Sequence, residues 1–210
     1  MLILFQTFLL VLALGIDAFV CSFSYGANKI KIPLKSLLMI NVITITLLFV
    51  GTMTAGLLSL ILPSFLLEWI PFSILFFLGI SKVFEGVIKA FIRKHKGIRH
   101  VKFSLFNLGF ILQIYADYEQ ADADDSKELS VKEAIPLAVA LGIDGLSVGF
   151  SVGLTAISVP LLLGMSFIVE FFCVLLGAAL GHNTAKRINF DLSILGGFIL
   201  ITIALFELLH

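Results

Sequence analysis

The sequence predicts an all-α integral membrane protein with six transmembrane helices arranged as two inverted-topology three-helix repeats. Composition is the first observation, because 60% of the 210 residues are hydrophobic and only 13% are charged. A soluble domain with so few charges could not cover its surface, whereas lipid removes the need for a polar exterior. The other two observations are six long apolar runs and a motif that occurs in both halves of the chain.

The six apolar runs are each long enough to cross a bilayer, which takes about 20 helical residues. No basic segment precedes the apolar part of the first run, which also exceeds the core of a signal peptide, so we expect this run to be retained. The two cysteines lie within runs and indicate no disulfide framework. The predicted spans are Leu2–Tyr25, Ser36–Leu62, Pro71–Ile92, Ala134–Ala156, Val159–Gly181 and Phe190–Leu209.

The basic residues predict the orientation of these spans. Every Lys and Arg except Lys82 lies between spans one and two, at the end of span three or in the long loop after it, or between spans five and six. By the positive-inside rule these loops are cytoplasmic and both termini are outside. The near-zero net charge hides this asymmetry and gives no reason to expect a nucleic-acid partner.

The recurring motif divides the chain into two halves. "LALGIDAFVCSFSYGA" (Leu12–Ala27) and "VALGIDGLSVGFSVGL" (Val139–Leu154) are identical at 8 of 16 positions. The first copy lies in a span that enters the cytoplasm and the second in one that leaves it. This is the pattern of an inverted repeat, which is typical of secondary transporters that bind substrate near the membrane midplane.

We therefore expect three units. Residues 1–92 form the first three-helix repeat and residues 134–210 form the second. Residues 93–133 form a cytoplasmic loop. Within it, Phe103–Tyr115 is apolar but too short to span, so we expect an interfacial or partly re-entrant segment.

Each copy of the motif carries one aspartate inside the membrane. Asp17 is 12 residues from Lys29 and Asp144 is 12 residues from Lys132, which places both about 18 Å from the cytoplasmic flank. An ionised carboxylate there costs at least about 2.5–3.5 kcal/mol. Protons could neutralise the pair, as could one divalent cation, and oxygen ligands suit Mn²⁺, Mg²⁺ and Ca²⁺. The alternative is that the aspartates are protonated or hydrogen-bonded contacts between helices.

Other intramembrane polar residues could complete this predicted metal site. A serine follows each aspartate at i+7, on about the same helix face. Glu170 has no basic residue near it in its own span, whereas Glu85 lies three residues from Lys82 and could form a structural ion pair with it. The candidate metal ligands are Asp17, Asp144, Glu170, Ser24, Ser151, Glu85, Asn41 and Thr44.

The end of the central loop has the spacing of a calcium-binding loop, "DADDSKELSVKE" (Asp122–Glu133). Position 6, normally glycine, is Lys127, which must then adopt an unfavourable positive φ. Calcium binding here could bias the position of Asp144 on the following helix, and the alternative is a solvated acidic loop. The candidate regulatory calcium ligands are Asp122, Asp124, Ser126, Glu128 and Glu133.

The paired "GID" motifs, "LGISKVFEG" (Leu78–Gly86) and "LGG" (Leu195–Gly197) resemble the putative manganese efflux pump family, and within it the sporulation membrane protein branch. The resemblance implies a multi-pass protein of the bacterial cell membrane that exports Mn²⁺ or a similar cation, with Asp17 and Asp144 as the family's two membrane aspartates. The exporters carry a glutamate in span two, where this chain has Thr44 or its neighbours. Here the additional acid is Glu170 in span five.

Three function classes follow. The leading one is a divalent cation transporter that binds the ion at the membrane midplane between Asp17 and Asp144 and works by alternating access. Its partners are the metal ion and the lipid bilayer, it has no prosthetic group, and a homodimer is left open. The second is a non-transporting sporulation membrane protein or cation sensor that uses the Asp122–Glu133 loop. The third is an intramembrane aspartyl protease, whose sequence motifs this chain lacks. We therefore expect no enzyme activity.

Overall fold

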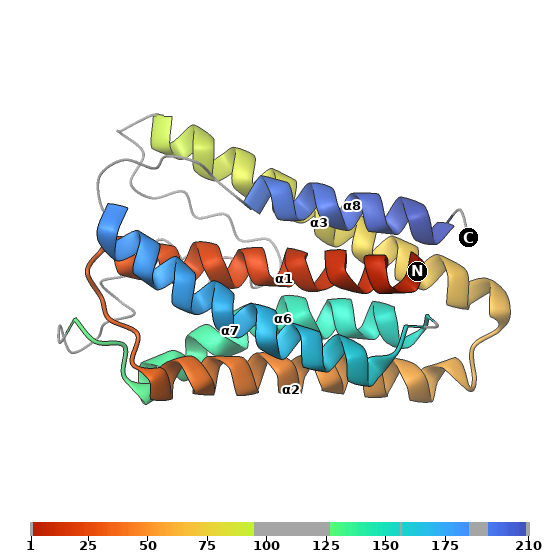
Figure 1. The fold of residues 1–210 in the computed structure, drawn as a ribbon. Helices are drawn as coiled ribbons and strands as arrows, with labels where there is room; N and C mark the ends of the chain where they lie inside the picture. Colours follow the sequence, from red (N-terminus) through yellow and green to blue (C-terminus); the bar gives the residue numbers. More distant parts are fainter. Residues whose placement is uncertain (1, 95–126, 156, 185–192, 209–210) are drawn as a thin grey trace.

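The computed structural model describes residues 2–94, 127–155, 157–184 and 193–208. The predicted interfacial segment and three predicted calcium ligands, Asp122, Asp124 and Ser126, lie outside the described residues. Within the described residues the chain forms helices and no named β-strand (Figure 1). The helices are α1 (Leu2–Ala27), α2 (Leu34–Ser59), α3 (Ser64–Lys94), α6 (Val131–Gly153), α7 (Val159–Thr184) and α8 (Ser193–Leu208).

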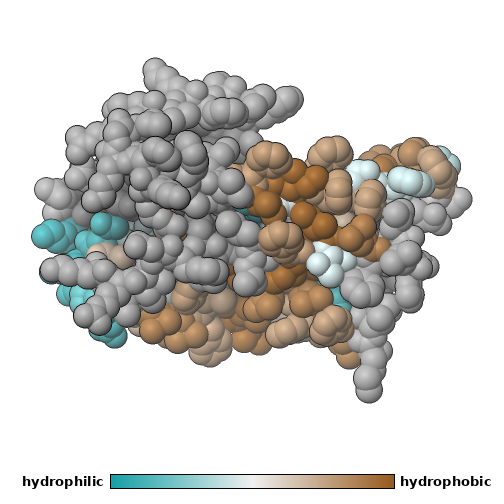
Figure 2. All heavy atoms as spheres, turned by 90° about the horizontal axis from the view of Figure 1, so that it is seen from above, coloured by the Kyte–Doolittle hydropathy of each residue, from teal (hydrophilic) through white to brown (hydrophobic). Residues whose placement is uncertain are grey.

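The helices confirm the predicted class, a multi-helix membrane protein. Five of them are long and apolar enough to cross a bilayer, and the described part of α8, the sixth, has 16 residues. Large apolar side chains face outward, including Leu60 at 83% exposed, whereas the polar side chains of Thr7, Asn41 and Ser151 are buried. Figure 2 shows the resulting hydrophobic band along the helices, with most hydrophilic residues gathered toward one end. Such an exterior suits lipid as the solvent.

Each helix of the first half packs mainly against one helix of the second half. α1 packs against α7, α2 against α6, and α3 against α8. Both chain termini lie at the same end of the bundle as the α2–α3 and α6–α7 connections, and the α1–α2 connection lies at the opposite end (Figure 1). The two halves of the chain are therefore packed against each other through all three helix pairs and do not form two separate bodies.

Glycines allow two of these helix pairs to approach closely. A methyl group at Gly181 of α7 would lie 2.1 Å from the carbonyl oxygen of Phe23 in α1, and one at Gly51 of α2 would lie 2.2 Å from that of Leu146 in α6. A side chain at either position would push the backbones apart, as at other close helix crossings in membranes. Both "GID" helices are thus held at fixed distances from their partners.

The predicted start of span three was wrong by seven residues. α3 begins at Ser64, and Pro71 lies inside it. The Pro63 carbonyl accepts from the backbone N–H groups of Leu66 and Leu67, which starts the helix before the proline. The missing N–H of Pro71 removes the hydrogen bond that the Leu67 carbonyl would otherwise accept. The Ser151 hydroxyl of α6 donates to the Pro71 carbonyl at 3.0 Å and so links the two helices beside the proline.

Candidate cation site

The centre of the bundle holds an ion-pair cluster of one lysine and the two motif aspartates. Lys82 Nζ donates to Oδ2 of Asp17 and, at 2.8 Å, to Oδ2 of Asp144. The three side chains come from α3, α1 and α6, so the cluster joins both halves of the chain. The structure thus pairs Lys82 with aspartates of two other helices, whereas the sequence suggested Glu85 of its own helix as the partner. The side chain of Glu85 lies outside the described part of the structure.

Burial explains why these charges are paired. The side chain of Lys82 is 8% exposed and that of Asp17 is 14% exposed, whereas that of Asp144 is 38% exposed. A buried charge without a partner is strongly destabilising, and pairing offsets part of its desolvation cost. With all three groups ionised, two carboxylates and one ammonium leave one net negative charge. The cluster can therefore accept further positive charge.

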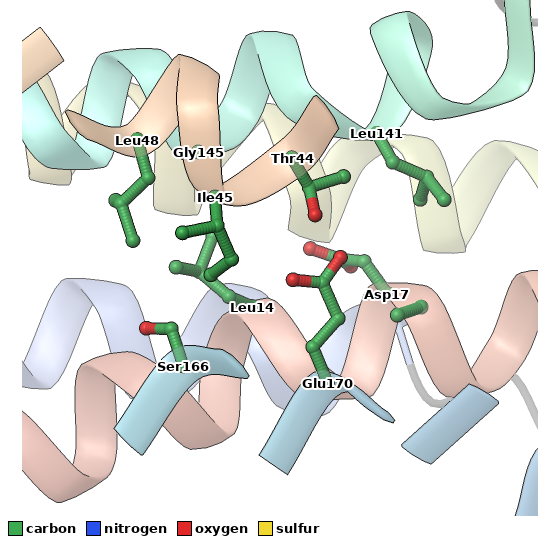
Figure 3. Close-up of a pocket in the computed structure, with 10 residues that line it drawn as sticks. Leu14, Asp17, Thr44, Ile45, Leu48, Leu141, Gly145, Ser166 and Glu170 are labelled. Atoms are coloured by element: carbon green, nitrogen blue, oxygen red, sulfur yellow. The ribbon is translucent and has the colours of Figure 1, made fainter. Parts of the chain in front are cut away.

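A small cavity lies beside Asp17, on the side of α2 and α7. Its volume is about 20 Å³, which is room for roughly one water-sized species. Asp17, Thr44 and Glu170 extend toward one another in this cavity from α1, α2 and α7 (Figure 3). Glu170 is buried, and the Thr44 hydroxyl beside it donates to the backbone carbonyls of Ile40 and Asn41. The remaining lining residues are Leu14, Ala18, Ile45, Leu48, Leu141, Gly145 and Ser166.

Two buried oxygen atoms near this cavity have no hydrogen-bond partner among the described residues. They are Ser166 Oγ, which lines the cavity, and Asn41 Oδ1. The amide of Asn41 is otherwise engaged, because its Nδ2 donates to the Phe167 carbonyl of α7 at 3.0 Å. Buried polar atoms normally have partners. Oxygen atoms of this kind are suitable to coordinate a cation or to form a hydrogen bond with a water molecule.

The structure brings together some of the predicted ligands and leaves others apart. Asp17, Thr44 and Glu170 share the cavity, and Asp144 joins them through Lys82. Ser24 and Ser151 are not among the residues that line the cavity, and Ser151 instead bonds to Pro71. Among the described residues, no group of three or more His, Cys, Asp or Glu side chains is arranged to hold a metal ion. A complete metal site would therefore need these carboxylates to move closer together.

The positions of Lys82 and Ser166 at the site were not predicted from the sequence. Lys82 was visible as the one basic residue away from the cytoplasmic side, yet only its nearest acid in sequence was considered as its partner. Ser166 lies four residues before Glu170, on the same face of α7, and the i,i+4 spacing was the signal that could have identified it. Both residues reach the site from helices whose neighbours the sequence did not reveal.

The segment before α6 has a structural role that the calcium prediction did not include. Ser130 Oγ accepts from the backbone N–H of Glu133 at 3.4 Å, and Glu133 Oε2 accepts from that of Ser130 at 2.9 Å. This capping box starts α6 and was readable from the Ser-x-x-Glu spacing. Lys127 has a φ of 58°, which confirms the predicted positive value. Glu128 pairs with Lys31 in an isolated parallel β-bridge.

A sequence profile of the family described as "Putative manganese efflux pump" matches residues 57–208, which is more than half of the chain. The chain belongs to this family. The matched residues include Lys82, Asp144 and Glu170, whereas Asp17 and Thr44 precede them. Membership confirms the predicted resemblance, and a family of efflux pumps is a class of transport proteins and not of enzymes.

The chain is also similar to the curated "Probable sporulation protein YtaF" of Bacillus subtilis (strain 168). The two sequences are 28% identical over 206 residues, which cover 95% of this chain and 97% of the relative. The likeness therefore extends over α1 and the first aspartate motif as well. No solved structure matches the chain.

Proposed function

We propose that this protein exports Mn²⁺ or a similar hard divalent cation and binds it between Asp17 and Asp144 at the membrane midplane. The observation that carries the proposal is that both carboxylates contact the same atom, Lys82 Nζ. Two acidic side chains from different halves of the chain therefore bracket a single positive charge. Carboxylate oxygens are ligands that Mn²⁺, Mg²⁺ and Ca²⁺ accept, and the family description supports Mn²⁺ as the substrate.

The cavity supplies further oxygen ligands for this ion. Mn²⁺ and Mg²⁺ usually take about six oxygen or nitrogen ligands, and Ca²⁺ takes six to eight. Two aspartates alone would not satisfy these ions. Glu170 and Ser166 of α7 and Thr44 of α2 line the cavity that Asp17 enters, so small movements of these two helices toward Asp17 would add their oxygens to the set. Water would complete the coordination.

The helix pairing supports alternating access through two inverted repeats. Exchanging the two halves converts the α1·α7 contact into α6·α2 and leaves α3·α8 as it is, which is the pairing expected around a pseudo-two-fold axis. Thr44 and Glu170 are 126 residues apart and the two aspartates are 127 apart, so both pairs occupy near-equivalent positions. Because the closest contacts join the two halves, the moving bodies would be pairs of helices, and rocking of the α1·α7 pair against the α2·α6 pair would expose the ion to each side in turn. The basic loops would face the cytoplasm and both termini the outside.

Transport by purified protein in proteoliposomes tests this function. Uptake of Mn²⁺, Ca²⁺, Mg²⁺ and Zn²⁺ is measured for wild type, for the Asp17→Asn/Asp144→Asn variant, and for Glu207→Gln as a matched acid-to-amide control near the end of α8. We expect wild type and Glu207→Gln to carry Mn²⁺ at similar rates and the double variant to lose uptake. Undiminished Mn²⁺ uptake by the double variant would show that the site is elsewhere.

A second candidate function rests on the name of the Bacillus subtilis relative. That protein is described as a probable sporulation protein, with no mention of transport. A non-transporting role in this chain, as a cation sensor through the Asp122–Glu133 loop, would leave the loop essential and the membrane aspartates dispensable. The same proteoliposome assay separates the two functions, because a sensor binds the ion without any flux.

A further inference from the structure

We propose that Lys82 is a tethered competitor of the substrate cation, whose ammonium group and the divalent ion occupy the same place between Asp17 and Asp144 in turn. This inference rests on the proposed function. It assigns to a residue of α3 the task of emptying the site and balancing part of its negative charge between transport cycles. Lys82 would then control release of the ion without being one of its ligands.

The shared contacts of Lys82 carry this argument. Its Nζ donates to both carboxylates, and the 2.8 Å distance to Asp144 is that of a charge-assisted hydrogen bond. A divalent ion bridging the same oxygens would lie about 2.0–2.6 Å from each. The two positions overlap, and a +1 and a +2 charge so close together repel strongly. The carboxylates can therefore hold the ammonium or the ion, and not both.

The location of Lys82 suits an exchange of this kind. It lies between Asp17, which enters the cavity with Glu170, and Asp144, whose side chain is 38% exposed. An ion that reaches Asp144 first must displace the ammonium before it can also contact Asp17. The lysine stem has four carbon atoms and rotates freely, so the ammonium can move without movement of its helix.

The backbones that carry the two aspartates are less free to move. Gly181 and Gly51 hold α1 against α7 and α2 against α6 at backbone contact distance. The element of the cluster that can move without a shift of any helix is therefore the lysine side chain. When the ion leaves, the ammonium returns to the two carboxylates. Neither carboxylate is then left without a counter-charge, which would be costly inside the protein.

Equilibrium binding of Mn²⁺ to purified protein in detergent tests the competition. Affinity is measured by calorimetry for wild type, Lys82→Met and Lys82→Arg, with thermal unfolding as the control for folding. We expect Lys82→Met to bind Mn²⁺ at least tenfold more tightly and to transport it at least tenfold more slowly, because release becomes limiting. Lys82→Arg keeps the charge and should bind within about threefold of wild type. Equal or weaker binding by folded Lys82→Met would overturn the proposal.

Two further measurements remain informative if Lys82→Met does not fold. The first compares Asp144→Asn with Asp144→Asn/Lys82→Met, because the double variant removes one charge of each sign. The double variant should bind Mn²⁺ at least tenfold more tightly than Asp144→Asn. The second uses wild type, in which saturating Mn²⁺ should increase acetylation of Lys82 by acetic anhydride several-fold relative to exposed Lys29. Unchanged affinity between the two variants, or unchanged acetylation of Lys82, would contradict the proposal.

The outcomes also separate this inference from the proposed function. If wild type neither binds nor transports any divalent cation, the proposed function fails and the inference fails with it. If wild type transports Mn²⁺ and the removal of the Lys82 charge leaves affinity unchanged, the inference alone fails. Lys82 would then be a fixed structural partner of the aspartates.

Discussion

Asp17 and Asp144 occupy the same position of a repeated motif, yet their surroundings differ. Asp17 is 14% exposed and lines the cavity with Thr44 and Glu170, whereas Asp144 is 38% exposed and does not line it. Both bond to Lys82, so neither is an independent site. The comparison teaches that equal positions in a repeated motif do not give the carboxylates equal surroundings, because the neighbouring helices decide what each carboxylate contacts.

The largest expected effect comes from removing one aspartate at a time. Asp17→Asn should lower Mn²⁺ transport more than about 100-fold, because it removes the carboxylate that the ion would share with Glu170. Asp144→Asn should lower transport about tenfold, because the more exposed position can recruit water as a replacement ligand. Initial rates in proteoliposomes measure both, with protein amount and orientation matched. A larger loss in Asp144→Asn than in Asp17→Asn would reverse the proposed inner and outer roles.

The two helix pairs that hold the aspartates should lose similar stability when a methyl group is added at their contact glycines. Gly181→Ala in the α1·α7 pair and Gly51→Ala in the α2·α6 pair should each destabilise the protein by about 1–3 kcal/mol, since the added methyl meets backbone atoms. Gly164→Ala is the matched control in α7, where a Cβ meets nothing within 4 Å. Unfolding in a detergent titration gives the three stabilities. A loss confined to one pair would show that the two halves are not held alike.

A smaller effect is expected from substitutions on the cavity side of the site, where Glu170 and Thr44 lie beside Asp17. Glu170→Gln should lower Mn²⁺ affinity about tenfold, or roughly 1.4 kcal/mol, because it replaces a charged ligand with a neutral one beside Asp17. Thr44→Ser keeps the hydroxyl group that faces Glu170 and is expected to stay within about twofold of wild type. Calorimetry with Mn²⁺ measures both. An unaltered affinity in Glu170→Gln would confine the ion to the two aspartates.

Much of the fold was predictable because lipid imposes one requirement on every span. A membrane helix must satisfy its own backbone hydrogen bonds, so long apolar runs become helices whatever their neighbours. The start of α3 was not predictable in this way. Pro71 indicates a helix start by its missing N–H, but the helix already begins after Pro63, and the Pro71 carbonyl accepts from Ser151, which is 80 residues away in sequence.

The candidate site was predictable only in part, for the same reason. The repeat identified Asp17 and Asp144 as a pair without any knowledge of packing, and the structure brings both to the Lys82 ammonium. Their link through Lys82 depends on the packing of α3 against α6 and on the lysine side chain reaching Asp17 of α1, which no local pattern encodes. The position of Glu170 beside Asp17 likewise follows from the close α1·α7 packing that glycines permit.

The smallest expected effect concerns the start of α6, the helix that carries Asp144. Ser130→Ala should cost about 1 kcal/mol of stability because it removes one half of the capping box. Glu133→Gln should cost less, since an amide oxygen can still accept from the Ser130 N–H. Thermal unfolding with and without Ca²⁺ separates capping from calcium binding at the same residue. If Glu133 acts only as a cap, Ca²⁺ leaves the unfolding temperatures of wild type and both variants unchanged. If it is also a calcium ligand, Ca²⁺ stabilises wild type more than Glu133→Gln, and the second aspartate motif then has a regulatory input that the first one lacks.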